Sequence, residues 1–247
     1  MWDLFISIFI NVLLWIYNVI GQNFGVAIIL FTVLIRIVTW PLNAQQMKGA
    51  KAMQDLQNDK DWQAIQKKYA KDREKLAQEQ MRIYREKGIN PFGSCLPTLI
   101  QFPIIIALYQ SIIRALASTP LDLLKLSRSI NPNFLDVANL IPLNSKFLWM
   151  NLGQPEPYYI LAIVVAATTY IQSKLTLPPS TNPNDQSAAM GQSMTITMPL
   201  MLGWFALTFP SGLAVYFITS NVLGIVQYAA QGKANWSNLL PKSMRKT

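Results

Sequence analysis

The sequence of 247 residues contains no histidine and only one cysteine, Cys95. The lack of histidine excludes Ser-His and Cys-His catalysis, the HExxH zinc motif and most transition-metal sites. A single cysteine can form neither an internal disulfide nor a cysteine metal cluster. The chain also lacks the GxxxxGK(S/T) motif of P-loop ATP-driven pumps. We therefore expect a protein that is not an enzyme and that needs no cofactor or metal.

Charged residues are scarce as well. They make up 13% of the chain, against 51% hydrophobic residues, and the mean hydropathy is +0.24. Soluble domains carry about twice that share of charge. This composition predicts an all-α integral membrane protein.

The first clear apolar run, residues 23–41, contains an arginine, Arg36. The run is about long enough to cross a bilayer, yet a guanidinium in hydrocarbon costs at least a few kcal/mol. Arg36 lies four residues before Trp40, so it sits about 6 Å below that interfacial anchor. On this segment alone, Arg36 either reaches the nearer headgroups or faces a hydrated cavity inside a helix bundle.

Residues 1–22, before this span, predict an amphipathic helix that lies in the external membrane interface. Its polar residues Asp3, Ser7, Asn11 and Asn18 fall within roughly 80° of one another on a helix. A short transmembrane segment is the alternative.

Residues 42–90 are polar and predict a helical hairpin outside the bilayer. They contain eleven basic and seven acidic residues. Apolar residues recur at helical spacing in two groups, the first comprising Trp62, Ile65 and Tyr69 and the second Leu76, Ile83 and Tyr84. A turn at Lys71 and Asp72 between the groups predicts two helices.

Four more spans are predicted within residues 91–232, which gives five in total. They cover roughly residues 95–113, 158–173, 195–209 and 213–228, and a loop at 115–157 separates the first two of these. The loop holds three basic residues, whereas the tail 233–247 holds four and no acidic residue. The positive-inside rule then places the hairpin and the tail in the cytoplasm, and the N-terminus and the loop outside.

With this orientation, hydrogen-bonding side chains gather in the cytoplasmic halves of the spans. They are Arg36, Thr39, Gln101, Gln172, Ser173, Thr195, Thr197 and Gln227. The external halves have almost none apart from Gln110 and Ser111, and Asn221 sits near mid-depth. One buried amide is common between membrane helices, but this asymmetry over five spans predicts a hydrated cavity that opens inward. It favours the hydrated environment for Arg36.

Several motifs resemble the YidC/Oxa-type membrane protein insertase family, in particular bacterial members without a large external domain. They are NPFGSCLPTLIQFPIIIALYQ (90–110), TVLIRIVTWPLNAQQ around Arg36, PYYIL (157–161) and FPSGLAVYFITSN (209–221). The resemblance covers nearly the whole chain. It implies five core spans, an external amphipathic helix, a mobile cytoplasmic hairpin, and an inner-leaflet groove with Arg36 as its arginine and Gln101 as a neighbour.

The function that this resemblance implies is insertion of nascent transmembrane segments into the bacterial cell (inner) membrane through a hydrophilic groove. The implied partners are nascent membrane proteins, the lipid bilayer, the ribosome and the Sec translocon, without direct recognition of nucleic acid beyond ribosome contact. We assign the substrate groove to Arg36, Thr39, Gln101, Gln172, Thr197 and Gln227.

Two other functions compete with this one. A small transporter or channel would need polar residues through both leaflets or symmetric repeats, and the sequence has neither. An intramembrane protease would need histidine, or Asp or Glu within a span, and the predicted spans contain none of these.

Overall fold

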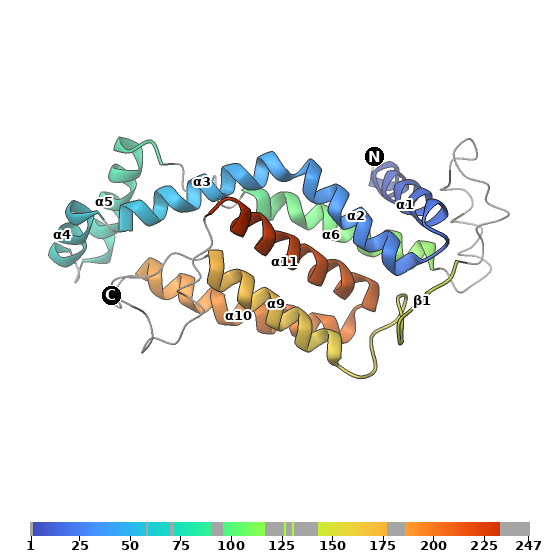
Figure 1. Cartoon of the computed structure of the whole chain (residues 1–247). Coiled ribbons are helices and arrows are strands. Elements are labelled where there is room, and N and C mark those ends of the chain that lie inside the picture. The colour runs from blue at the N-terminus through green and yellow to red at the C-terminus, as the bar shows by residue number, and fades with distance from the viewer. Residues whose placement is uncertain are drawn as a thin grey trace.

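The computed structural model describes residues 2–57, 59–69, 72–89, 96–116, 126, 130, 143–176 and 186–232. This part of the chain is mostly helical (Figure 1). The helices are α1 (Trp2–Val19), α2 (Phe24–Val38), α3 (Trp40–Gln57), α4 (Lys60–Lys68), α5 (Arg73–Glu86), α6 (Leu96–Ala115), α9 (Ile160–Thr176), α10 (Gln186–Thr208) and α11 (Ser211–Ala230). A two-stranded antiparallel hairpin, β1 (Lys146–Phe147) and β2 (Met150–Asn151), precedes α9.

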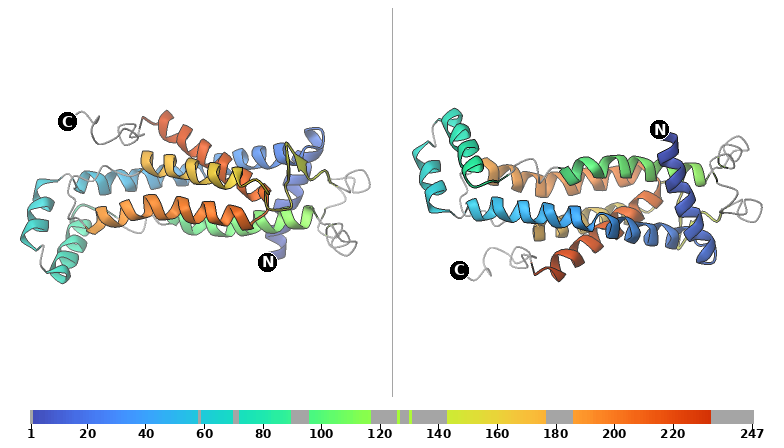
Figure 2. Two further views of the ribbon diagram at one scale, coloured as in Figure 1. Left: turned by 90° about the horizontal axis from the view of Figure 1, so that it is seen from below. Right: turned by 90° about the horizontal axis from the view of Figure 1, so that it is seen from above.

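Five helices, α2, α6, α9, α10 and α11, run along the long axis of the molecule (Figure 1). α1 crosses this axis at one end, and α4 and α5 lie at the opposite end (Figure 2). We call these the α1 end and the hairpin end. α11 packs against both α2 and α9, while α10 packs mainly against α9.

α1 packs one face on the bundle, and its place in the membrane interface stays a prediction. Ile6, Ile10, Leu13 and Tyr17 recur at helical spacing and are buried against α2 and α6. By contrast, the apolar residues Leu4, Ile8, Trp15 and Val19 are exposed. α1 is long and apolar enough to span a membrane, but in this fold it lies across the other helices (Figure 2).

Among the described helices, only α1 and α11 meet the length and hydropathy expected of a membrane span. The segments Phe24–Val38, Ile100–Ala115, Ile160–Thr176 and Thr195–Thr208 are apolar but shorter. α2 begins where the Asn23 side chain accepts a hydrogen bond from the Val26 N–H, as an N-cap does. Beyond Thr39, α3 follows α2 with a bend between the two helices (Figure 1). The number of spans therefore stays a prediction.

The predicted hairpin region contains three helices, α3, α4 and α5, rather than two. The extra break lies at Asp59, whose side chain accepts a hydrogen bond from the Asp61 N–H and caps α4. The start of the second predicted helix agrees with the structure, where Asp72 caps α5 by accepting a hydrogen bond from the Lys75 N–H. A small apolar cluster holds the helices together, and its buried members are Leu56, Trp62, Ile83 and Tyr84.

The main hydrophobic core lies at the α1 end. Buried apolar side chains on the five long helices sit in the half nearer α1, and Leu175 is the exception among the described residues. They are Phe24, Ala27, Ile28 and Phe31 on α2, Ala107, Leu108, Ile112 and Ala115 on α6, Leu161, Ala162 and Val165 on α9, Ala206 on α10, and Leu213, Ala214, Val215 and Tyr216 on α11. α1 completes this core.

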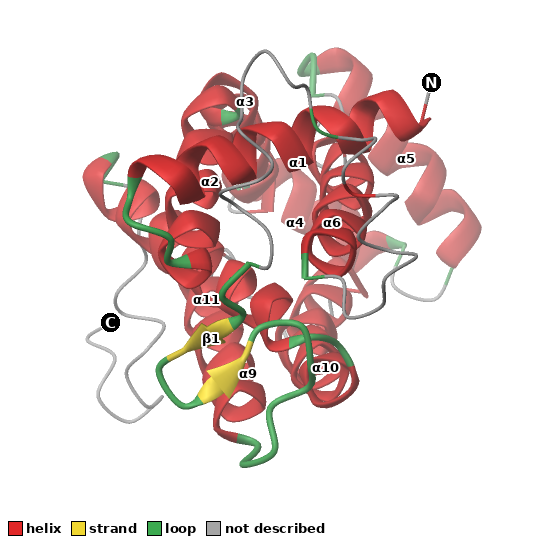
Figure 3. Ribbon diagram, turned by 90° about the vertical axis from the view of Figure 1, so that its right-hand side faces the viewer, coloured by secondary structure: helices red, strands yellow, loops and turns green. Residues whose placement is uncertain are grey.

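The loop before α9 covers the same end of the bundle (Figure 3). The Phe147 ring lies directly against Gly25, where a Cβ atom would overlap it. The Gly212 N–H at the start of α11 donates to the Leu152 carbonyl at 3.0 Å, and Leu152 is fully buried. Buried Glu156 accepts hydrogen bonds from Trp149 Nε1 at 2.9 Å and from the Leu161 N–H at 2.8 Å. These contacts fix the loop onto the ends of α2, α9 and α11.

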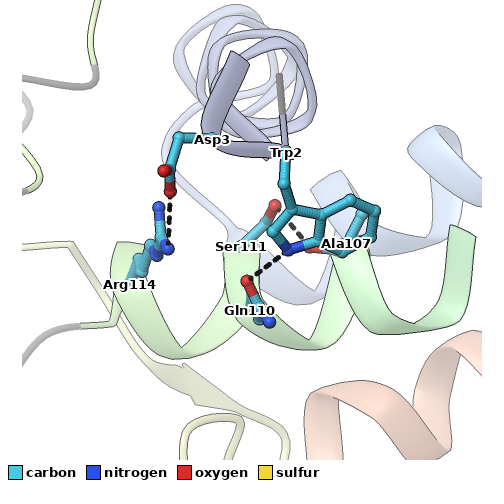
Figure 4. Close-up of polar contacts among 6 residues, drawn as sticks. All are labelled: Trp2, Asp3, Ala107, Gln110, Ser111 and Arg114. Atoms are coloured by element: carbon cyan, nitrogen blue, oxygen red, sulfur yellow. Dashed lines mark hydrogen bonds and ion pairs between the residues drawn. The ribbon is translucent and has the colours of Figure 1, made fainter. Parts of the chain in front are cut away.

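Polar side chains on the outer part of α6 hold α1 in place (Figure 4). Trp2 Nε1 donates to Gln110 Oε1 at 3.3 Å, and Arg114 forms an ion pair with Asp3 at 3.2 Å. Ser111 donates to the carbonyl of Ala107, one turn earlier on its own helix, at 2.7 Å. Gln110 and Ser111 were the polar exceptions in the external halves of the predicted spans. In the structure, their hydrogen bonds to Trp2 and to the Ala107 carbonyl account for them.

Candidate functional site

Arg36 points from α2 to the middle of α11. Its Nε donates to Ser220 Oγ at 3.2 Å, and Nη2 donates to Ser220 Oγ at 2.8 Å and to the Ser220 carbonyl at 2.5 Å. In the described part of the chain, Arg36 forms no ion pair with a carboxylate. The guanidinium therefore keeps its full positive charge beside neutral partners.

Gly224 lies one helical turn beyond Ser220 on α11, and a residue of a third helix, α9, approaches it. A Cβ atom at Gly224 would lie 2.6 Å from Gln172 Nε2 and 3.2 Å from Arg36 Nη2. The side chains of Arg36 from α2 and Gln172 from α9 thus both rest on the bare backbone of α11. Both are partly exposed, so the junction of the three helices is accessible from outside the bundle.

Gln101 connects α6 to the same face of α11. Its Nε2 donates to the hydroxyl of Tyr216, and Tyr216 is one turn before Ser220. Tyr216 is buried, whereas Gln101 is partly exposed. Four helices therefore contribute polar groups to one site, whose members Arg36, Gln101, Gln172, Tyr216, Ser220 and Gln227 we call the polar cluster.

Gln227 is the last member of this cluster along α11. Its side chain is buried, with 3% of the residue exposed, and its Nε2 has no hydrogen-bond partner in the described part of the chain. Leaving a buried amide donor unpaired costs about 1–3 kcal/mol. Such a group calls for an explanation, and an acceptor supplied by a bound ligand or water is one.

Two of the six predicted groove residues lie apart from the polar cluster. Thr39 donates to the Ile35 carbonyl at 2.8 Å and accepts from Asn43 Nδ2 at 3.4 Å, so it bonds to its own helical segment. Thr197 is exposed on α10, and α10 makes little contact with α11. The structure brings together Arg36, Gln101 and Gln172, and places Gln227 on the same face of α11. The role of all six residues in a groove stays a prediction.

Sequence reasoning missed three α11 residues, Tyr216, Ser220 and Gly224. With Gln227 they recur at intervals of four, four and three, which is one face of a helix. All four are buried, so this face points into the bundle. The spacing is visible in the sequence, but Ser and Gly in an apolar helix equally suit close helix packing.

A boundary between the polar cluster and the apolar core lies near Asn221. Its Nδ2 donates to Thr168 Oγ1 at 3.1 Å and to Thr169 Oγ1 at 2.8 Å, which ties α11 to α9. Unlike Gln227, this buried amide has found partners.

The chemistry of the polar cluster suits binding rather than bond-breaking. It offers a permanent cation, amide groups and hydroxyl groups. In the described residues no group of His, Cys, Asp or Glu could hold a metal ion. Such a site can attract acidic or polar groups into a region flanked by apolar helices.

Comparison with known proteins gives consistent results. A model of the 60Kd inner membrane protein family matches residues 15–235. The membrane protein insertase YidC 2 of Listeria innocua is 39% identical over 220 residues, which is 87% of this chain and 66% of that protein. The membrane protein insertase YidC of Oceanobacillus iheyensis is 37% identical over 231 residues, which is 90% of this chain and 81% of that protein.

A solved structure also resembles this fold. It is a crystal structure of an active YidC insertase with the first transmembrane domain resolved. The TM-score is 0.59 at 25% sequence identity, and the match covers 94% of this chain and 46% of that chain.

Proposed function

Because the chain belongs to the 60Kd inner membrane protein family, whose matched relatives are membrane protein insertases, we propose that it moves nascent transmembrane segments from the cytoplasm into the bilayer. The family predicted from the sequence motifs is confirmed. The same comparisons favour an insertase over a transporter or channel.

We further propose that α2, α6, α9, α10 and α11 span the membrane, with the hairpin end in the cytoplasm. The charge distribution supports this orientation, because residues 42–90 contain eleven basic residues and the loop at 115–157 contains three. The exposed apolar residues of α1 support its place in the external interface. Nascent chains would then arrive at the hairpin end, and the ribosome and the Sec translocon are the partners that the resemblance implies.

The polar cluster would act as a hydrophilic groove in the cytoplasmic leaflet. A polar flank of a nascent segment meets a barrier that is set by the cost of dehydrating its charged groups. Water and hydrogen-bonding side chains in the inner half of the bundle would shorten the hydrocarbon that this flank must cross. Arg36 would attract acidic groups of the flank. The apolar segment would then enter lipid, which is the favourable step.

One observation carries this proposal: Arg36, in the last turn of α2, bonds to neutral Ser220 near the middle of α11 and has no carboxylate partner among the described residues. A purely structural arginine at this depth would be expected to pair with an acidic side chain, because an unpaired buried charge is costly. A charge kept available instead suits a transient partner.

The test measures membrane insertion of a substrate whose external flank is acidic. It uses cells in which this chain is the insertase under test. Arg36→Ala should reduce insertion at least about tenfold, since a hydrogen-bonded charge contributes about 1.5–3 kcal/mol. Arg36→Lys keeps the charge and should retain part of the activity, although it loses the forked geometry toward Ser220. Arg114→Ala is the matched control, because it removes an equal charge at the α1 end. Full insertion by a folded Arg36→Ala protein would refute the proposed role.

A further inference from the structure

Three hydrogen-bond donors of the polar cluster have no acceptor in the described part of the chain. They are Arg36 Nη1, Gln172 Nε2 and Gln227 Nε2, which come from α2, α9 and α11. The Arg36 contacts to Ser220 use only Nε and Nη2. The cluster therefore contains unused donors beside one uncompensated positive charge.

The lack of a side chain at Gly224 allows two of these donors to lie close together. Because it has no side chain, Gln172 Nε2 and Arg36 Nη2 both approach the α11 backbone, at 2.6 Å and 3.2 Å from the position of a Cβ atom. Gln227 follows three residues later on the same buried face. Helical side chains lean toward the N-terminus of their helix, which favours an approach of the Gln227 amide to Gly224. Two of the three donors, on Arg36 and Gln172, therefore meet at Gly224, and the third follows on the same buried face of α11.

The surface beside this site is apolar. Ile37 and Val38, which follow Arg36 on α2, are 66% and 69% exposed, and Val226, which precedes Gln227 on α11, is 57% exposed. Arg36 itself is partly exposed. An anionic headgroup could contact Arg36, and an attached apolar tail could contact the exposed apolar residues beside it.

We propose that the polar cluster binds a phosphate group when no nascent chain is present. The group is either the headgroup of a cytoplasmic-leaflet phospholipid or inorganic phosphate. A phosphate offers several strong acceptor oxygens in a tetrahedral arrangement, which matches converging donors that a single carboxylate could not all reach. It also neutralises the guanidinium charge and supplies an acceptor for the buried Gln227 amide.

A bound phosphate is a resting ligand of the polar cluster, and its binding does not require that the chain insert any protein. Binding can therefore be measured on the purified full chain without a translocation assay, and a failure of either claim is visible separately.

The experiment is native mass spectrometry of the full chain in a neutral detergent. Three probes are added separately: dioctanoyl phosphatidylglycerol, dioctanoylglycerol without phosphate, and inorganic phosphate. We expect the phosphatidylglycerol to bind and the uncharged dioctanoylglycerol to bind at least about tenfold more weakly, since hydrogen bonds to charged groups are the strong ones. Arg36→Gln should lower the affinity for the phosphatidylglycerol by about tenfold or more, and Gln227→Leu by a smaller factor.

A third variant distinguishes a ligand site from general membrane affinity. Gln227→Glu introduces an anion on the buried face of α11, three residues beyond Gly224, and should abolish phosphate binding while the protein stays folded. Gln110→Leu, which changes a glutamine at the α1 end, is the matched control and should leave binding unchanged. Binding of the phosphatidylglycerol alone assigns the lipid, and binding of inorganic phosphate with similar sensitivity to the variants assigns the free ion. If neither phosphate probe binds, or if Arg36→Gln and Gln227→Glu leave binding unaltered, the proposal is wrong.

Discussion

The two halves of the long helices are built on different principles. Toward the α1 end, α2, α6, α9, α10 and α11 bury apolar side chains against one another, and α1 and the β1–β2 loop cover them. From mid-helix toward the hairpin end, the buried side chains are mainly polar, as Thr169, Ser220, Asn221 and Gln227 illustrate. The same five helices therefore provide a packed half and a half that contains the polar cluster.

This difference separates stability from function. In the packed half, polar groups such as Glu156 and Ser211 have protein partners, so these groups are already satisfied within the fold. In the other half, Arg36 and Gln227 keep unused donors at a cost in stability. A protein tolerates such groups where they serve binding, because the packed half can carry the fold.

The largest effect is expected from truncating the packed half. Leu108→Ala removes a fully buried side chain on α6 and should lower the free energy of unfolding by about 2–5 kcal/mol. Leu200→Ala on α10 is the matched control, because Leu200 is 65% exposed and its loss should change stability by no more than about 0.5 kcal/mol. Reversible unfolding in detergent micelles measures both. Equal losses would mean that burial in the packed half does not carry the stability of the fold.

A smaller change in stability is expected when either of two buried amides of α11 is replaced, and the two replacements should differ in sign. Asn221→Leu breaks the hydrogen bonds to Thr168 and Thr169 and should destabilise the protein by about 0.6–2 kcal/mol. Gln227→Leu removes a donor that has no partner among the described residues. In phosphate-free buffer it should leave stability unchanged or raise it. A clear loss of stability for Gln227→Leu would show that this amide is part of the packing after all.

The difference between the halves was predictable from the sequence, because charges and amides stand out in an apolar segment. Arg36, Gln101, Gln172 and Gln227 were found in this way. The depth of a residue in the membrane follows from its position along a span, but the direction of its side chain around the helix does not. Thr197 has the depth of the polar cluster, yet it lies on an exposed face of α10.

Other features needed the tertiary structure. Gly224 contributes by lacking a side chain, and this matters only because Arg36 and Gln172 from other helices approach it. In the hairpin region, the break at Asp59 depends on its capping of α4 and on its ion pair with Lys87. The spacing of apolar residues alone does not reveal the break between such short helices. The loop residues 117–125, 127–129 and 131–142 and the basic tail 233–247 lie outside the described residues, so the predictions for them stay untested.

The smallest effect concerns the hairpin region and pH. The ammonium of Lys87, followed by the backbone N–H of Asp61, lowers the pKa of Asp59, and the Lys75 N–H lowers that of Asp72. The pKa of each carboxyl is therefore lower in the folded state than the unfolded value of about 3.9. The capping contribution is fully present above the unfolded pKa and is lost as the pH falls through the folded pKa.

Amide hydrogen exchange checks this dependence. Protection factors of α4 and α5 should be constant above about pH 5 and fall below about pH 4, while those of α11 should not change over this range. Asp59→Asn should weaken the pH dependence in α4. An unchanged profile in this variant would exclude Asp59 as the titrating cap.

Cysteine labelling of the proposed spans tests the central claim that one half is hydrated and the other is not. Single cysteines would be introduced in a Cys95→Ser background at Gln172 and Val164 on α9, and at Thr39 and Val26 at the two ends of α2. All four positions are partly exposed, so burial does not distinguish them. In membranes, a permeant maleimide should label positions 172 and 39 rapidly and positions 164 and 26 slowly, because the reactive thiolate forms in water and not in hydrocarbon. Equal labelling within both pairs, whether fast or absent, would contradict the account.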